Sequence, residues 1–207
     1  MIDETGKTAI SLPLMRPVIC VVGPTASGKT DVAQLLAQNL SGEVVSADSM
    51  QIYRGMDIGT GKLPEEKRLV PHFGFDLVNP GEPYSAAVYQ QYARECFSDI
   101  DKRGKRALLV GGTGLYVRAA IDAYDFPKGE QVDNPVREKW TSYYKDNGAD
   151  KLWERLRERD PKSASVIHPN NVRRVIRAFE LLEEGTTYAT QKENLASIPQ
   201  AVPAKFI

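Results

Sequence analysis

The stretch GPTASGKT, Gly23 to Thr30, follows directly on the apolar run VICVV, Val18 to Val22. The run is short and rich in valine and isoleucine, which is typical of a buried parallel strand. The stretch itself matches the phosphate-binding loop (P-loop) pattern G-x-x-x-x-G-K-[ST], which requires a strand before it and a helix after it. The sequence therefore predicts an α/β fold in which helices flank a parallel P-loop sheet.

A loop of this kind binds phosphate for physical reasons. Its glycines let successive backbone N–H groups turn toward the anion, and the start of the following helix adds its dipole. Lys29 contributes a positive charge, and Thr30 contributes a hydroxyl that suits Mg²⁺. We therefore expect a diphosphate or nucleotide at the loop residues Gly23, Pro24, Thr25, Ala26, Ser27, Gly28, Lys29 and Thr30.

Two further strands are predicted at EVVSAD, residues 43–48, and RALLVGG, residues 106–112. A helix capped by Ser85 is predicted between them, and strands that alternate with helices favour a parallel sheet with right-handed crossovers. The helix after the loop is expected to bury one apolar stripe, formed by Val32, Leu35, Leu36 and Leu40.

Beyond residue 127 the pattern becomes helical, and it predicts three parts. Residues 1–15 form a loose tail, residues 16–135 the P-loop core, and residues 136–207 a helical segment, with a loop-like end. Residues 137–177 hold 11 Lys and Arg against 6 Asp and Glu, in a chain with no net charge. A basic segment of this kind fits either a polyanion partner or a solvated helical surface.

Composition excludes several classes of protein. No apolar stretch reaches the roughly 20 residues of a membrane span, so we expect no membrane segment. No secretion signal opens the chain, which favours the cytoplasm. Cys20 and Cys96 are interpreted as buried thiols in a reducing compartment, and His72 and His168 are assigned no metal because neither lies near a cysteine.

The residues alone leave the reaction open. A phosphoryl-transfer enzyme usually places an acid at a strand end to order Mg²⁺. The predicted strand at residues 106–112 ends in glycines, whereas the strand at residues 43–48 delivers Asp48. Asp48 suits either that metal-ordering role, as in a kinase, or the role of a general base at the ligand edge of the sheet.

Five sequence blocks carry a resemblance to a known family. In chain order they are GPTASGKT, SADSMQIYRGMDIGTGK, HFGFDLVNPGEPYS, GGTGLY and NNVRRVIRAFEL. Together, over about Pro17 to Leu182, the chain resembles the tRNA dimethylallyltransferases, also called isopentenyl-tRNA transferases. The resemblance implies Mg²⁺-dependent transfer of a dimethylallyl group from dimethylallyl diphosphate to N6 of an adenosine next to the anticodon. The tRNAs implied are those that read codons starting with U, and the enzyme implied is a monomer.

The resemblance also implies roles for individual residues. Asp48 and Thr113 are the implied catalytic residues, and Thr30 is the implied Mg²⁺ ligand. The implied tRNA contacts are Asp48, Ser49, Met50, Gln51, Thr113, Arg137, Arg173, Arg174, Val175, Ile176 and Arg177. This chain, with 207 residues, is shorter than is usual for the family. In the family, the chain leads back from the helical segment to the core, and we predict that this return is absent here.

Three alternatives remain beside this interpretation. A P-loop kinase for a small molecule or nucleotide would explain the loop but would leave the basic helices without a role. A nucleic-acid-binding protein would keep the fold without turnover. A prenyltransferase acting on free adenine nucleotides would not need the basic segment.

Overall fold

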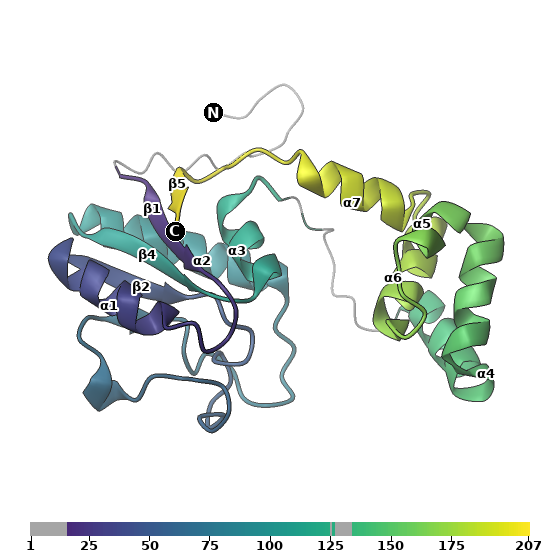
Figure 1. The fold of residues 1–207 in the computed structure, drawn as a ribbon, viewed down its shortest axis with the longest axis horizontal. Helices are drawn as coiled ribbons and strands as arrows, with labels where there is room; N and C mark the ends of the chain where they lie inside the picture. Colours follow the sequence, from purple (N-terminus) through teal and green to yellow (C-terminus); the bar gives the residue numbers. More distant parts are fainter. Residues whose placement is uncertain (1–15, 125, 127–133) are drawn as a thin grey trace. The chain divides into compact units, whose positions relative to one another are not determined.

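The computed structural model describes residues 16–124, 126 and 134–207 (Figure 1). The chain divides into two compact units. The first unit runs to residue 126 and takes up the chain again at residue 199, and the second runs from residue 127 to residue 198. Each unit has its own hydrophobic core.

The first unit is built on a five-stranded parallel sheet with the strand order β3-β2-β4-β1-β5. Apolar residues fill its central strands, as a sheet covered on both faces requires. The strands are β1 (Val18–Val22), β2 (Gly42–Ser46), β3 (His72–Phe73), β4 (Arg106–Gly111) and β5 (Ala204–Phe206). This confirms the predicted parallel α/β sheet and its strands at β1, β2 and β4.

Helices cover both faces of the sheet (Figure 1). On one face lie α2 (Ala86–Lys102), whose N-cap Ser85 accepts a hydrogen bond from the Val88 amide, and α3 (Gly114–Ile121). On the other face lies α1 (Lys29–Asn39). A short 3₁₀ helix, Glu65–Lys67, interrupts the long loop between β2 and β3.

The predicted buried stripe of α1 was wrong except at Leu36, which packs against the core. Val32 and Leu35 are 47% and 56% exposed, whereas Ala33 and Ala37 are fully buried against the sheet. Residues four apart share a helix face, and the two alanines let the helix backbone approach the strands closely. Val32 and Leu35 therefore lie on the side of the helix that faces away from the sheet.

The end of the chain also differs from the prediction. Residues 199–207 return to the first unit, and β5 pairs in parallel with β1, with Ile19 opposite Lys205. The expected absence of a return to the core is thus contradicted for this stretch. The free edge of β1 offers backbone hydrogen bonds, so the three residues of β5 form a strand that their own sequence pattern does not predict.

The second unit is helical throughout its described residues. Its helices are α4 (Pro135–Arg159), α5 (Pro161–Ser165), α6 (Val172–Glu183) and α7 (Tyr188–Ala196). Gly148, with φ of 85°, breaks α4 into two helical stretches. The Trp140 and Phe179 rings stack at the centre of this unit with centroids 3.7 Å apart. Helix α7 falls where the sequence predicted a loop.

Candidate active site

The loop after β1 has the geometry that phosphate binding requires. Gly28 is the N-cap of α1 and has a φ of 80°, a conformation that residues with a side chain rarely adopt. At the end of β4, a Cβ on Gly111 would lie 2.3 Å from the Ala47 carbonyl oxygen, so only glycine fits there. Gly28 thus sets the turn from the loop into α1, and Gly111 lets the end of β4 approach the residue after β2 closely.

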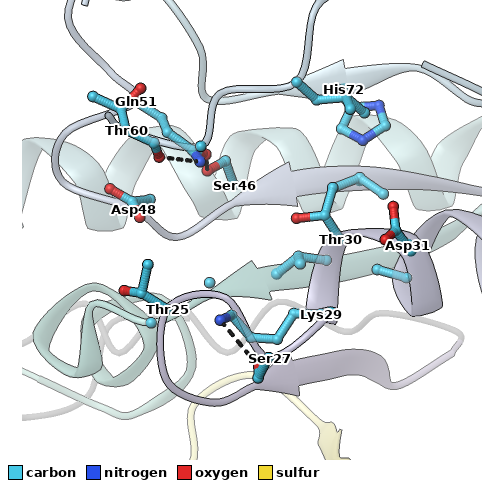
Figure 2. A pocket seen from close by; sticks show the side chains of 18 of the residues that line it. Thr25, Ser27, Lys29, Thr30, Asp31, Ser46, Asp48, Gln51, Thr60 and His72 are labelled. Atoms are coloured by element: carbon cyan, nitrogen blue, oxygen red, sulfur yellow. Dashed lines mark hydrogen bonds between the residues drawn. The ribbon is translucent and has the colours of Figure 1, made fainter. Parts of the chain in front are cut away.

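The Lys29 side chain folds back over the loop. Its ammonium group donates to the Pro24 carbonyl oxygen and to the Ser27 hydroxyl, which lies 3.5 Å away (Figure 2). The side chain is only half-buried. The positive charge is therefore placed over the loop, where an anion bound by the backbone N–H groups would meet it.

Asp48 follows the carboxyl end of β2, the edge at which parallel sheets bind ligands. Its Oδ1 accepts a hydrogen bond of 2.8 Å from the Met50 amide, which leaves Oδ2 with no protein partner among the described residues. The side chain is half-buried. One carboxylate oxygen is thus anchored, and the other is available to a ligand.

Thr113 lies beside this segment and acts on its backbone. The Thr113 hydroxyl accepts a hydrogen bond of 3.0 Å from the Ser49 amide, and the Thr113 amide donates to the Ala47 carbonyl oxygen at 3.1 Å. Thr113, two residues beyond the end of β4, is therefore tied to both neighbours of Asp48. This geometry gives Thr113 a role in holding the Asp48 segment.

Gln51 is fixed on the other side of Asp48. Its side-chain oxygen accepts from the Ser46 hydroxyl at 2.7 Å, and its amide donates to the Thr60 carbonyl oxygen at 3.1 Å (Figure 2).

Lys62 forms a buried ion-pair cluster in the same loop region. Its side chain is 4% exposed, and its ammonium group forms ion pairs of 2.7 Å with Asp57 and with Asp76. Burial lowers the pKa of Lys62, but the bonds to the two aspartates outweigh it and raise the pKa above its usual value.

These elements enclose a pocket of about 240 Å³. The loop forms one side, and Asp48 and Gln51 lie on the opposite side (Figure 2). The lining residues are Thr25–Asp31, Ala33, Val44, Ser46, Asp48, Gln51, Thr60, Gly61, Leu63, His72, Phe75 and Val110–Gly112. Ser49, Met50 and Thr113 do not belong to this lining.

Several lining residues were missed from the sequence. Thr60, Gly61 and Leu63 come from a glycine-rich loop, and His72 and Phe75 come from the two-residue edge strand β3 and the turn after it. Their neighbourhood in GMDIGTGK and HFGF was quoted for the resemblance, so the blocks themselves were the available signal. Their side chains carried no pattern of their own.

The predicted tRNA-contacting arginines of the second unit divide into two pairs. Arg137 and Arg177 form ion pairs of 2.7 Å and 2.9 Å with Glu180, whose side chain is fully buried. Burial alone would raise the pKa of Glu180, but the two guanidinium groups outweigh it and lower the pKa below its usual range. The Arg137 pair joins α4 to α6, and the Arg177 pair lies within α6.

Arg173 and Arg174 are exposed on α6, and the described residues give them no ion pair. Val175 and Ile176, also predicted as contacts, are 0% and 8% exposed and pack in the core of the second unit. That expectation is corrected, because a stretch of consecutive helical residues turns its side chains to all faces of the helix.

The described residues contain no group of three or more His, Cys, Asp and Glu side chains that could hold a metal ion by themselves. Nor does any described helix combine the length and apolar character needed to cross a membrane.

Comparison with known proteins decides the family. The profile described as IPP transferase matches residues 51–206, and the one described as isopentenyl transferase matches residues 16–70. This chain belongs to the IPP transferase family. The resemblance carried by the five sequence blocks is thereby confirmed.

Curated members of the IPP transferase family are similar over most of this chain. The tRNA dimethylallyltransferase of Bacillus licheniformis is 46% identical over 180 residues, which is 86% of this chain and 56% of that protein. The tRNA dimethylallyltransferase of Bacillus subtilis strain 168 is 46% identical over 87% of this chain and 57% of that protein. The chain thus spans a little over half the length of these relatives.

Solved structures of the IPP transferase family agree in fold. The full-length tRNA isopentenylpyrophosphate transferase of Bacillus halodurans is 44% identical, with a TM-score of 0.52, over 83% of this chain and 57% of that one. A eukaryotic dimethylallyltransferase, described as acting on tRNA, is 29% identical with a TM-score of 0.70. The similarity covers 92% of this chain and 47% of the eukaryotic chain.

Proposed function

We propose that this chain transfers a dimethylallyl group from dimethylallyl diphosphate to N6 of an adenosine next to the anticodon of tRNA. The tRNAs are those that read codons starting with U, and the reaction belongs in the cytoplasm. The observation that carries the proposal is that Asp48 and the phosphate-binding loop line one pocket. The relatives named above support the choice of substrates.

The loop side of the pocket would hold the diphosphate. When the allylic C–O bond breaks, negative charge develops on the leaving diphosphate, and Lys29 and the loop N–H groups stabilise it. The residues present fit a Mg²⁺ ion, because this ion takes one or two protein oxygens together with phosphate oxygens and keeps several waters. Thr30, at the start of α1 and in the pocket lining, would supply the protein oxygen. Bound there, Mg²⁺ would add positive charge beside the leaving group.

The Asp48 side of the pocket would receive the adenine. Its exocyclic amine forms a bond to the allylic carbon as the C–O bond breaks, and it must lose one proton. Asp48 is the general base that accepts this proton through the carboxylate oxygen that has no protein partner. The Met50 amide holds the other oxygen of that carboxylate, Thr113 holds the backbone of the next residue, Ser49, and Gln51 borders the same space.

The second unit would bind the tRNA. Residues 137–177 carry an excess of five positive charges, and phosphate contacts supply most of the affinity for nucleic acid. Arg173 and Arg174 are the exposed cations that we assign to the RNA backbone. Arg137 and Arg177 remain candidate contacts, although Glu180 already uses part of their hydrogen-bonding capacity. Met50, 45% exposed beside the pocket, is a candidate contact to the adenosine's neighbours.

A label-transfer assay tests the proposal. The protein is incubated with MgCl₂ and labelled dimethylallyl diphosphate, with unmodified tRNA, AMP or no acceptor, and ATP consumption is followed in parallel. We expect label on tRNA only. Label on AMP would replace tRNA by a free nucleotide as the acceptor. ATP consumption without label transfer would favour a P-loop kinase, and tRNA binding without label transfer would favour a binding protein; either result would overturn the proposal.

A further inference from the structure

His72 on β3 carries a nitrogen atom with no partner. Its Nδ1 lies 2.7 Å from the Val70 carbonyl oxygen, and because a carbonyl only accepts, Nδ1 must carry the hydrogen. Burial, with a smaller contribution from Arg68, lowers the pKa of the imidazole below its usual value despite that bond. At neutral pH the ring is therefore uncharged, and Nε2 presents a lone pair.

This lone pair is shielded from solvent without being satisfied. Nε2 is buried and forms no hydrogen bond with the described residues. A buried polar atom left unpaired costs about 1–3 kcal/mol, so such atoms are usually paired in the working state of a protein. His72 lines the pocket, and Figure 2 shows its imidazole pointing toward Thr30 and Asp31. A donor that enters this part of the pocket and displaces the atoms covering Nε2 would complete the pairing.

The orientation of the ring is well supported. The backbone of His72 pairs with Val44 in the sheet, and the imidazole stacks on the Phe75 ring with centroids 5.8 Å apart. The Arg68 guanidinium lies over the Phe75 ring, 4.9 Å from its centroid. The direction of the Nε2 lone pair is therefore built into the wall of the pocket.

The chemistry of the expected occupants selects the donor. A diphosphate offers only acceptor oxygens, so it cannot pair with the Nε2 lone pair. The adenine amine donates, but it is assigned to Asp48, which lies four residues beyond Val44, the partner of His72 in β2. The water molecules of a hydrated divalent cation are strong donors, and the proposed cation ligand Thr30 lies on the side toward which His72 points.

We propose that His72 Nε2 accepts a hydrogen bond from a water molecule of the Mg²⁺ ion bound at Thr30, and so acts as a positioning residue for that ion. The inference rests on the proposed function. It gives the pocket a neutral acceptor for the ion's water shell where β4 ends in Gly111 and Gly112 without an acid. Residues that orient a metal's own ligands typically change its affinity 10–100-fold when they are replaced.

Calorimetric titration with inorganic pyrophosphate, with and without MgCl₂, tests the inference. Three proteins are compared: the unsubstituted chain, His72→Phe, and His72→Gln, whose side-chain oxygen offers an acceptor in place of Nε2. We expect His72→Phe to reduce the Mg²⁺-dependent gain in pyrophosphate affinity about 10-fold. Pyrophosphate binding without Mg²⁺ should stay unchanged, and His72→Gln should recover part of the gain.

The outcomes separate this inference from the proposed function. An unchanged Mg²⁺ gain in His72→Phe would overturn the inference alone. Equal weakening with and without Mg²⁺, accompanied by a lower melting temperature, would make His72 a packing residue and would also overturn it. Failure of the unsubstituted chain to bind pyrophosphate at all would instead count against the proposed function.

Discussion

The phosphate-binding loop and helix α6 present positive charge in opposite ways. In the loop, Lys29 and residues Thr25–Gly28 line one pocket, and Gly28 has the left-handed conformation from which α1 begins. On α6 and its neighbour α4, two arginines converge on the buried Glu180, and the exposed Arg173 and Arg174 are left to face solvent. In the first unit Lys29 lines a pocket, whereas in the second unit only two of these four arginines pair with the buried carboxylate.

The comparison shows what a cluster of basic residues in a sequence means. A P-loop has a fixed spacing because the backbone itself binds the anion. Arginines near one another on helices have no such constraint, and a single buried carboxylate decides which of them are available. The predictions below challenge this contrast.

The largest expected effect is on the stability of the second unit. Glu180→Ala should lower the free energy of unfolding by about 3 kcal/mol, because it removes the partner of Arg137 and Arg177 and leaves a hole in the interior. Urea denaturation followed by tryptophan fluorescence reports on this unit through Trp140 and Trp153. The matched control is Glu184→Ala, whose partly exposed carboxylate also pairs with Arg177 and should cost less than about 1 kcal/mol. Equal losses in the two variants would contradict the contrast between the units.

A substitution in the phosphate-binding loop should change the affinity for pyrophosphate and leave stability nearly unchanged. Lys29→Ala should weaken pyrophosphate binding about 10- to 100-fold, since a hydrogen bond to a charged group contributes roughly 1.5–3 kcal/mol. Its melting temperature should stay close to that of the unsubstituted chain, because the Lys29 side chain is only half-buried. Lys102→Ala, an exposed lysine at the end of α2, is the control. Calorimetric titration with pyrophosphate measures both, and an unchanged affinity in Lys29→Ala would remove the lysine from the anion site.

Much of the first unit could be predicted because its local pattern and its tertiary role agree. Apolar residues, glycines and a lysine at fixed spacing predict β1, the loop and α1. β3 and β5 could not be predicted, since segments of two and three residues become strands only by pairing with an existing edge. The apolar stripe of α1 was misassigned because packing against a sheet favoured Ala33 and Ala37 over larger residues.

The candidate site was predictable to the extent that the backbone defines it. The loop and Asp48 lie in the pocket where the sequence placed them. The pairing of Arg137 with Glu180 joins residues 43 positions apart, and no periodicity reveals such a contact. The orphaned nitrogen of His72 likewise depends on what surrounds the ring in three dimensions.

The stability that Glu180 contributes should depend on pH. Its pKa is lowered in the folded protein, so the stability it contributes is fully present above its ordinary pKa of 4.5 and is lost as the pH falls through the lower, folded value. The difference in unfolding free energy between the unsubstituted chain and Glu180→Gln should therefore be constant between pH 5 and pH 7 and shrink below about pH 4.5. A difference that grows on acidification would reverse the sign of the pKa shift.

The smallest expected effect concerns the exposed arginines. Arg173→Ala should lower the affinity for tRNA about three-fold and reduce the slope of log affinity against log salt by about one, as the loss of one phosphate contact requires. Fluorescence anisotropy at several KCl concentrations measures both quantities. Lys102→Ala in the first unit serves as the charge-matched control. An Arg173→Ala protein with the same salt slope as that control would make α6 an ordinary solvated surface.

Asp48→Asn tests most directly whether one pocket joins a diphosphate-binding loop to a carboxylate base. The measurement is the single-turnover rate of label transfer from dimethylallyl diphosphate to tRNA, with pyrophosphate affinity measured on the same protein. The account predicts a rate at least 100-fold lower than that of the unsubstituted chain, with unchanged pyrophosphate affinity. Transfer by Asp48→Asn at the rate of the unsubstituted chain would contradict it.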